Sequence, residues 1–284
     1  MRMKPIEEAT LADRFIFFKV MQDADLCRHL LEIILNVEIE RIEYLEGEKN
    51  IEAKYDSKGI RLDVYVKDGR NTVYNIEMQA PYALHLPPRS RYYQGMMDVD
   101  MLEKGSGYES LSKSFVIFIC MSDVFGKGRH IYTFENRCIE DTTLALGDGT
   151  RKIFLNPYSN MDDVTPELAG FLKYLADGVA TDEFTERLVG AVETAKKNPR
   201  IMVEYMSYYA DQADREAERE AARRDGLAEG IEKGIERGKA EGIINTIKSI
   251  NGTIETAIQQ LITQCGMDAE KAARTAEMYW NEKQ

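Results

Sequence analysis

The sequence predicts a mixed α/β domain followed by a region built only of helices. Up to about residue 157, the patterns follow the order helix, strand, strand, strand, helix, strand, and beyond Asn156-Pro157 only helical patterns remain. A chain of 284 residues, 44% of them hydrophobic, is long enough to bury a substantial core. We therefore expect an α/β domain over residues 1–157, a helical region over residues 158–225, and a glycine-repeat helix with a helical hairpin over residues 226–284.

Two amphipathic helices are expected to open the α/β domain. The segment Thr10-Leu-Ala-Asp13 is predicted to cap the first helix, which carries Leu11, Phe15 and Phe18 on one face. Asp25 is predicted to cap the second helix. The apolar positions of this second helix have the spacing of a buried face: Leu26, Leu30, Ile33 and Ile34.

Six strand patterns and one further helix complete the α/β domain. Pro87-Pro88 predicts the start of the helix, because proline suits a first turn and cannot donate a hydrogen bond within a helix. Gly105 and Gly107 predict its end. The segment SFVIFICM is apolar throughout, which indicates a strand buried on both faces. The predicted strands cover residues 37–45, 60–67, 72–80, 114–121, 130–134 and 152–155, and the helix covers residues 87–103.

The helical half contains the only repeat in the chain. Helices are predicted over residues 165–179, 182–197 and 199–224, the last with Asn198 as its cap, and a helical hairpin over residues 254–265 and 268–280. Between them glycine recurs every four residues, at Gly226, Gly230, Gly234, Gly238 and Gly242. Each glycine inside a helix costs about 1 kcal/mol relative to alanine, so five cost roughly 5 kcal/mol. Two explanations remain open: a helix for oligomerisation or docking, and a solvated, partly helical linker.

The charge of the chain limits the partners that it can have. Lys and Arg number 37 and Asp and Glu 49, which gives a net charge of −12 and excludes a uniformly basic nucleic-acid coat. Most of the excess acid lies in the helical half, so a nuclease in the first half is compatible with this charge. Tight DNA binding at physiological salt is not expected unless a cation offsets the acidic residues.

The sequence also predicts where the protein is found. The longest apolar stretches are far shorter than the roughly 20 residues of a membrane helix, and we expect neither a membrane span nor a signal peptide. The four cysteines lack the close spacing of metal fingers or disulfide frameworks. We therefore expect reduced thiols in a cytoplasmic protein.

Two acidic residues lie opposite each other in the hairpin predicted for residues 60–79. If the turn is centred on Arg70, Asp63 pairs with Glu77 and Arg61 pairs with Gln79. Directly opposed like charges destabilise a sheet. A divalent cation such as Mg²⁺, which carboxylates and water bind, would explain them. The alternative is a solvent-facing hairpin in which Arg61 and Lys67 neutralise the acids, and geometry alone favours this alternative.

The motifs of this hairpin resemble those of the PD-(D/E)xK nuclease superfamily, in which Asp is followed by Glu-x-Lys in an αβββαβ core. The closer resemblance is to its recombination-promoting nuclease and transposase branch. It rests on Arg61-Leu-Asp63-Val, on Asn75-Ile-Glu77-Met-Gln79 and on the segment RSRYYQ that starts at Arg89. The resemblance covers roughly residues 8–155, and that branch often carries a glycine-repeat tail. It implies a PD-(D/E)xK nuclease-like α/β fold with a helical C-terminal region.

The resemblance implies a metal site and a catalytic set. Asp63 and Glu77 would bind Mg²⁺ or Mn²⁺, with the main-chain carbonyl of Met78 as a third ligand. Gln79 stands where the family usually has lysine; it cannot ionise, but its amide can orient water. Glu32 is the best-placed candidate for the acidic residue that the superfamily often supplies from its first helix, the alternative being an exposed helix charge.

The segment RSRYYQ predicts contacts with the substrate. Arg89 would bind phosphate through its forked donors, while Tyr92 and Gln94 would line the cleft. The alternative is an ordinary helix start with Tyr92 or Tyr93 packed on the sheet.

Three hypotheses for the function follow. The first is a metal-dependent DNA endonuclease, for which the superfamily implies products with 5′-phosphate and 3′-hydroxyl ends. The second is a catalytically weak scaffold that binds DNA or a protein partner. The third is a self-associating host-defence factor whose nuclease is inactive until it is triggered. In each of them the C-terminal helices are available to form a homo-oligomer.

Overall fold

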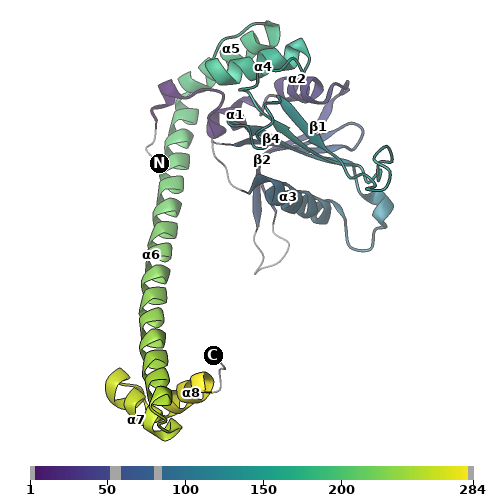
Figure 1. Ribbon diagram of the computed structural model, residues 1–284. Helices are drawn as coiled ribbons and strands as arrows, with labels where there is room; N and C mark the ends of the chain where they lie inside the picture. Colours follow the sequence, from purple (N-terminus) through teal and green to yellow (C-terminus); the bar gives the residue numbers. More distant parts are fainter. Residues whose placement is uncertain (1–3, 52–58, 80–84, 281–284) are drawn as a thin grey trace. The chain divides into compact units, whose positions relative to one another are not determined.

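The computed structural model describes residues 4–51, 59–79 and 85–280, and Figure 1 shows the course of the chain. Contacts divide the chain into two units, residues 1–209 and residues 210–284. The first unit contains the helices α1 (Arg14–Val20), α2 (Ala24–Leu35), α3 (Leu86–Met101), α4 (Pro166–Asp177) and α5 (Glu183–Lys197), the short 3₁₀ helices η1 (Ile6–Glu8) and η2 (Tyr108–Ser110), and the strands β1 (Ile42–Ile51), β2 (Ile60–Asp68), β3 (Val73–Gln79), β4 (Ser114–Cys120), β5 (Ile131–Phe134) and β6 (Thr150–Leu155). The helix α6 (Pro199–Ser249) runs from the first unit into the second, which also contains α7 (Ile254–Cys265) and α8 (Ala269–Trp280).

A mixed sheet forms the centre of the first unit. Its described strands lie in the order β1-β2-β3-β4-β6-β5. The first three are antiparallel neighbours, β3, β4 and β6 run parallel, and β5 pairs antiparallel to β6 at the edge. The predicted succession of a helix, three strands, a helix and a strand is confirmed. Because β3, β4 and β6 are parallel, their carboxyl ends lie along one edge of the sheet.

Helices cover both faces of this sheet. The core on one face contains residues of α1, α2, α4 and α5, and the core on the other contains residues of α3 (Figure 1). Every residue of β3 is buried, and so is every residue of β4 except the half-buried Phe115. The prediction that residues 114–121 form a strand buried on both faces is confirmed but for its last residue, Met121. The alternative explanation of the paired carboxylates, a solvent-facing hairpin, is wrong. Both strands of the hairpin lie between two layers of helices.

The cap of α1 lies within the predicted segment, and the predicted cap of α2 is wrong. Asp13, the last residue of the segment that starts at Thr10, caps α1 by accepting hydrogen bonds from the backbone N–H groups of Phe15 and Ile16. Asp23, not Asp25, caps α2 in the same way. The predicted apolar face of α2 is buried nevertheless. A side chain that accepts from the first free N–H groups decides where a helix begins, and each segment holds more than one residue able to do so.

The first strand starts later than the sequence pattern predicts. The strand was expected over residues 37–45, but β1 covers Ile42–Ile51. Asn36 ends α2 in a left-handed conformation, and Ile39 is buried before the strand begins. The polar second half of β1 is a strand because it pairs residue by residue with β2, and this pairing is not visible in a local hydrophobic pattern.

The long helix α6 continues through the glycine repeat. The helix was expected to end near residue 224, but α6 runs to Ser249. The explanation of the repeat as a partly helical linker is therefore wrong. Its last turns pack against α7 and α8, with a core that includes Ala240, Ile244, Leu261 and Ala276. None of the described helices is both long and apolar enough to cross a membrane.

We predict that the cap of α1 contributes more to stability than the cap of α2. Asp13 also accepts a hydrogen bond from the hydroxyl of Tyr209, so Asp13→Ala removes the cap and a long-range bond. We expect a loss of about 2 kcal/mol for Asp13→Ala, against about 1 kcal/mol for the matched Asp23→Ala. Urea unfolding followed by circular dichroism measures both, and equal losses would show that the tyrosine bond contributes nothing.

Candidate active site

Asp63 and Glu77 meet where the ladder between β2 and β3 ends. The structure pairs Val64 with Ile76 and Tyr65 with Asn75, which confirms the register predicted for the hairpin. Beyond the last of these pairs, the backbone N–H of Asp63 donates to Oε1 of Glu77 at 3.0 Å. The glutamate side chain thus takes the place of a backbone acceptor, and this brings the two carboxylates together.

The alternation of side chains along β2 changes at Asp63. Ile60 and Leu62 pack in the core beneath α3, whereas Val64 and Val66 pack in the core on the opposite face. A regular two-residue alternation along β2 would place these four residues on one face, and the structure does not have it. The change occurs where the ladder between β2 and β3 ends. From Val64 onward β2 pairs with both β1 and β3, whereas before Asp63 the described pairing of β2 is with β1.

Arg14, the first residue of α1, holds the carboxylate of Asp63. Its Nε donates to Oδ1 of Asp63 at 2.6 Å, and a second guanidinium nitrogen forms an ion pair with the same oxygen. The Asp63 side chain is only 4% exposed. Its other oxygen, Oδ2, is buried and has no hydrogen-bond partner within the described residues. Oδ1 of Asp63 thus contacts two nitrogens of Arg14, and Oδ2 has no partner among the described residues.

Arg89, in the first turn of α3, holds Glu77 and Gln79 together. One guanidinium nitrogen lies 2.9 Å from Oε2 of Glu77, and another donates to Oε1 of Gln79 at 2.6 Å. The Gln79 amide donates to Oε2 of Glu77 at 3.2 Å. The guanidinium also lies over the rings of Tyr93 and Phe118, 4.7 and 5.4 Å from their centroids. These contacts fix the plane of Arg89 and the position of Glu77.

The four charged groups shift one another's pKa values. Burial raises the pKa of Glu77, the nearby negative charge of Asp63 raises it further, and the two arginines oppose the rise. Burial also raises the pKa of Asp63, against the attraction of Arg14. Burial would lower the pKa of Arg14, but its bonds to Asp63 outweigh burial and raise it. Two carboxylates and two guanidiniums therefore balance each other in a site largely shielded from water.

The comparisons with known proteins agree with this geometry. A family model described as PD-(D/E)XK nuclease family transposase matches residues 14–157, half of the chain. The chain belongs to this family. The matched region ends within the first unit and contains the hairpin, both arginines and the sheet described above. The search of curated proteins and the search of solved structures each gave no match.

The donor atoms of this PD-(D/E)XK site suit a hard divalent cation. Oδ2 of Asp63 is a buried oxygen with no partner among the described residues, and Glu77 adds a second carboxylate beside it. Met78 directly follows Glu77 in β3, so its main-chain carbonyl belongs to the same stretch of strand. No cluster of three or more His, Cys, Asp or Glu side chains occurs among the described residues. Two carboxylates and a backbone carbonyl, completed by water, are the oxygen donors that Mg²⁺ accepts.

The structure places the other predicted site residues apart from this pair. Glu32 accepts from Arg28 and from the backbone N–H of Ile39, so it stabilises the end of α2. Gln94 is buried and donates to Ser114, at the amino end of β4. Tyr92 is 39% exposed on α3. Of the predicted substrate contacts, Arg89 is the one that reaches the carboxylates.

Sequence reasoning missed Arg14. It lies 49 residues from its partner Asp63, and the family motifs that drew attention to the hairpin do not include it. The sequence signal that could have found it is its place directly after Asp13, the residue that caps α1. The start of that helix fixes the position of Arg14.

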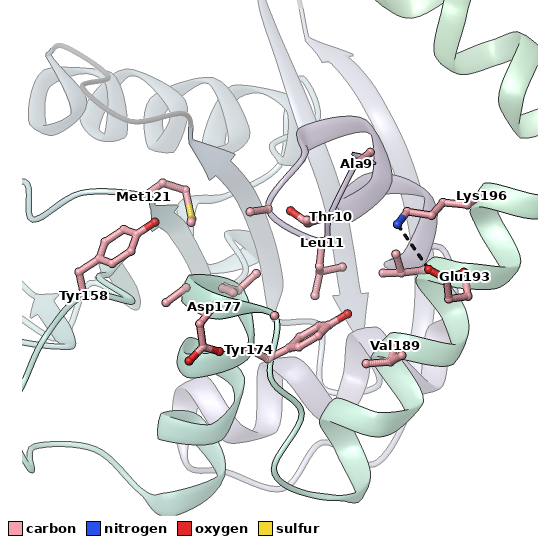
Figure 2. Close-up of a pocket in the computed structure, with 15 residues that line it drawn as sticks. Ala9, Thr10, Leu11, Met121, Tyr158, Tyr174, Asp177, Val189, Glu193 and Lys196 are labelled. Carbon is pink, nitrogen blue, oxygen red and sulfur yellow. Dashed lines mark hydrogen bonds and ion pairs between the residues drawn. The ribbon is translucent and has the colours of Figure 1, made fainter. Parts of the chain in front are cut away.

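A pocket of roughly 500 Å³ lies elsewhere in the first unit (Figure 2). Its walls come from the segment Ala9–Ala12, from Met121 and Tyr158, and from α4 and α5. Glu193 and Lys196 form an ion pair at its side. None of the four residues that form the charged cluster, Asp63, Glu77, Arg14 and Arg89, lines this pocket.

We predict that Glu77 makes the first unit less stable as the pH rises. Because its pKa is raised in the folded chain, Glu77 keeps a proton that the unfolded chain has lost above its ordinary pKa of 4.5. The stability from that proton is complete below pH 4.5 and is lost as the pH rises through the raised pKa. The loss is about 1.4 kcal/mol for each pH unit that separates the folded and unfolded pKa values. Unfolding of Glu77→Gln from about pH 5 to about pH 8 should therefore lack this decline.

Glu204→Gln provides the matched control. Its bond with Lys19 lowers the pKa of Glu204, so this carboxylate contributes stability that is lost only as the pH falls below the ordinary pKa. The control should keep the wild-type decline above about pH 5. An unchanged decline in Glu77→Gln would contradict the assignment to Glu77.

Proposed function

We propose that the protein is a metal-dependent DNA endonuclease that hydrolyses phosphodiester bonds. The observation that carries this proposal is the buried pair of Asp63 and Glu77, in which Oδ2 of Asp63 has no partner among the described residues, within the region that the family model matches. Paired carboxylates that face each other away from water destabilise a fold on their own account. A site that retains them is suited to binding a cation together with a phosphate group.

The metal in this proposal is Mg²⁺ or Mn²⁺. Oδ2 of Asp63, the carboxylate of Glu77 and the carbonyl of Met78 would hold it. When bound, such an ion polarises a phosphoryl oxygen and lowers the pKa of bound water. The chain's own residues keep the two carboxylates in position: Arg14 anchors one oxygen of Asp63, and Arg89 anchors one oxygen of Glu77.

Gln79 would orient the attacking water. Its amide already donates one hydrogen bond to Glu77 and accepts one from Arg89. An amide has two N–H donors and two acceptor lone pairs, so one of each is left for a water molecule. Because glutamine cannot take up the proton of that water, Gln79 would position it without acting as the base.

The DNA substrate would be held at the carboxyl edge of the parallel strands. The forked donors of Arg89 suit a phosphate oxygen, although phosphate would have to share them with Glu77 and Gln79. The roles of Tyr92, Gln94 and Glu32 stay predictions. The products would carry 5′-phosphate and 3′-hydroxyl ends, and the enzyme would act on DNA in the cytoplasm.

We predict that Mg²⁺-dependent cleavage of plasmid DNA depends on Asp63. Asp63→Ala removes a carboxylate of the proposed metal site, and we expect cleavage to fall by about a hundredfold or more, the scale on which one transition-state contact affects kcat. The control is Asp25→Asn, which removes a carboxylate that is 77% exposed in the first turn of α2 and should cleave like the wild type. Equal cleavage by wild type and Asp63→Ala would contradict the proposal.

A second candidate is a catalytically weak scaffold that binds DNA or a protein. Two observations favour it: glutamine replaces the usual lysine, and the guanidiniums of Arg14 and Arg89 already balance both carboxylates. Calorimetry that detects DNA binding but no uptake of Mg²⁺ or Mn²⁺ would support the scaffold over the enzyme.

We further propose that α6 joins two copies of the chain, as a self-associating host-defence factor would require. Leu227, Ile231 and Ile235 recur every four residues of α6 and are each more than half exposed. A Cβ atom added at any of the five glycines of the repeat would meet nothing within 4 Å. An exposed apolar row beside a row of glycines allows two helices to approach closely.

We predict that the full chain is an oligomer held by this row. Replacing Leu227, Ile231 and Ile235 together by Glu should reduce the molar mass in light scattering from at least two chains to one. Ile250→Glu is the control, because it places the same charge at an exposed apolar residue outside the row. A wild-type mass of one chain would contradict the proposal.

A further inference from the structure

Arg14 and Arg89 hold the two carboxylates in different ways. Arg89 is fixed by Glu77, by Gln79 and by the rings beneath it. Arg14 places two nitrogens on one oxygen of Asp63, and the side chains of Arg14 and Arg89 are similarly exposed, at 36% and 30%. The two arginines therefore differ in their partners: among the described residues Arg14 pairs with a single carboxylate oxygen, so fewer contacts hold its guanidinium in place.

When both carboxylates are ionised, the charges of Asp63, Glu77, Arg14 and Arg89 sum to zero. A divalent cation between Asp63 and Glu77 would add two positive charges a few ångströms from the guanidinium of Arg14. In a site shielded from water, charges at such distances repel each other strongly. The carboxylate of Asp63, which would attract the cation, is already paired with Arg14. The arginine therefore reduces the free energy that the cation would gain on binding.

We propose that Arg14 is a built-in counter-charge that competes with the divalent metal for Asp63 and thereby sets the metal affinity of the site. This inference rests on the proposed function, because it needs the metal to bind at the carboxylate pair. If a cation were bound by Asp63, the guanidinium of Arg14 would move away from Oδ1 of Asp63. A substrate phosphate that arrives with the metal gives the displaced guanidinium a new anionic partner, so metal and DNA strengthen each other's binding.

A purely anchoring role for Arg14 makes the opposite prediction. If Arg14 served only to orient Asp63, so that Oδ2 faces the metal, its removal would leave the carboxylate free to turn and would weaken metal binding. The sign of the change in metal affinity therefore separates competition from anchoring.

The test is a titration of the full chain with Mn²⁺, in which electron paramagnetic resonance counts the free ion. Arg14→Gln keeps a hydrogen-bonding side chain without the charge, and we expect it to bind Mn²⁺ about tenfold more tightly than the wild type. Arg14→Lys keeps the charge on a more mobile stem, and we expect an intermediate gain of about threefold. The control is Arg200→Gln, which removes an arginine that pairs with Glu204, outside the charged cluster and away from every predicted site residue, and should bind like the wild type.

The outcomes separate this inference from the proposed function. Competition by Arg14 is supported if Arg14→Gln binds Mn²⁺ most tightly, Arg14→Lys less tightly and the wild type least tightly. Unchanged or weaker binding by both Arg14 variants, with a wild type that binds Mn²⁺, overturns the inference and leaves the metal site in place. If neither the wild type nor any variant binds Mn²⁺, the metal-dependent function fails and the inference fails with it. Circular dichroism establishes that each variant is folded, and Arg14→Lys decides alone if Arg14→Gln does not fold.

Discussion

The contact between the N–H of Asp63 and the carboxylate of Glu77 is the constraint on which the rest of the site depends. It places two acidic side chains together at the end of a ladder that is buried on both faces. Like charges in such surroundings repel strongly unless positive groups lie close to them. The helices α1 and α3 therefore have to begin where Arg14 and Arg89 can reach the pair.

The part of the site that lies within the hairpin could be predicted from the sequence. A turn centred on Arg70 gives the register that the ladder from Val64–Ile76 to Lys67–Val73 shows, and the same register brings Asp63 next to Glu77 just beyond the ladder's end. Contacts between distant segments could not be predicted in this way. Arg14 reaches Asp63 across 49 residues, while Glu32, which the family pattern favoured, is engaged by the N–H of Ile39 near its own helix.

The same distinction explains which elements the sequence predicted well. The boundaries of α4 and α5 follow from caps in their own sequence, Thr165 and Asp182, and were predicted to within two residues. The strand β1 and the helix α6 extend beyond their patterns because partners support them. Pairing with β2 makes a strand of the polar residues in β1, and the α7–α8 hairpin stabilises the last turns of α6 despite its glycines.

The two arginines also make the site depend on both layers of the fold. Arg14 comes from α1, whose apolar residues pack in the core on one face of the sheet, and Arg89 comes from α3, which covers the other. Neither core alone supplies both counter-charges. The two halves of the site differ in the contacts that hold each arginine: Arg89 is bonded to Glu77 and Gln79 and stacked on Tyr93, whereas Arg14 bonds to one oxygen of Asp63, whose Oδ2 has no partner among the described residues. The half around Glu77 can therefore keep its geometry while the half around Asp63 responds to an incoming cation.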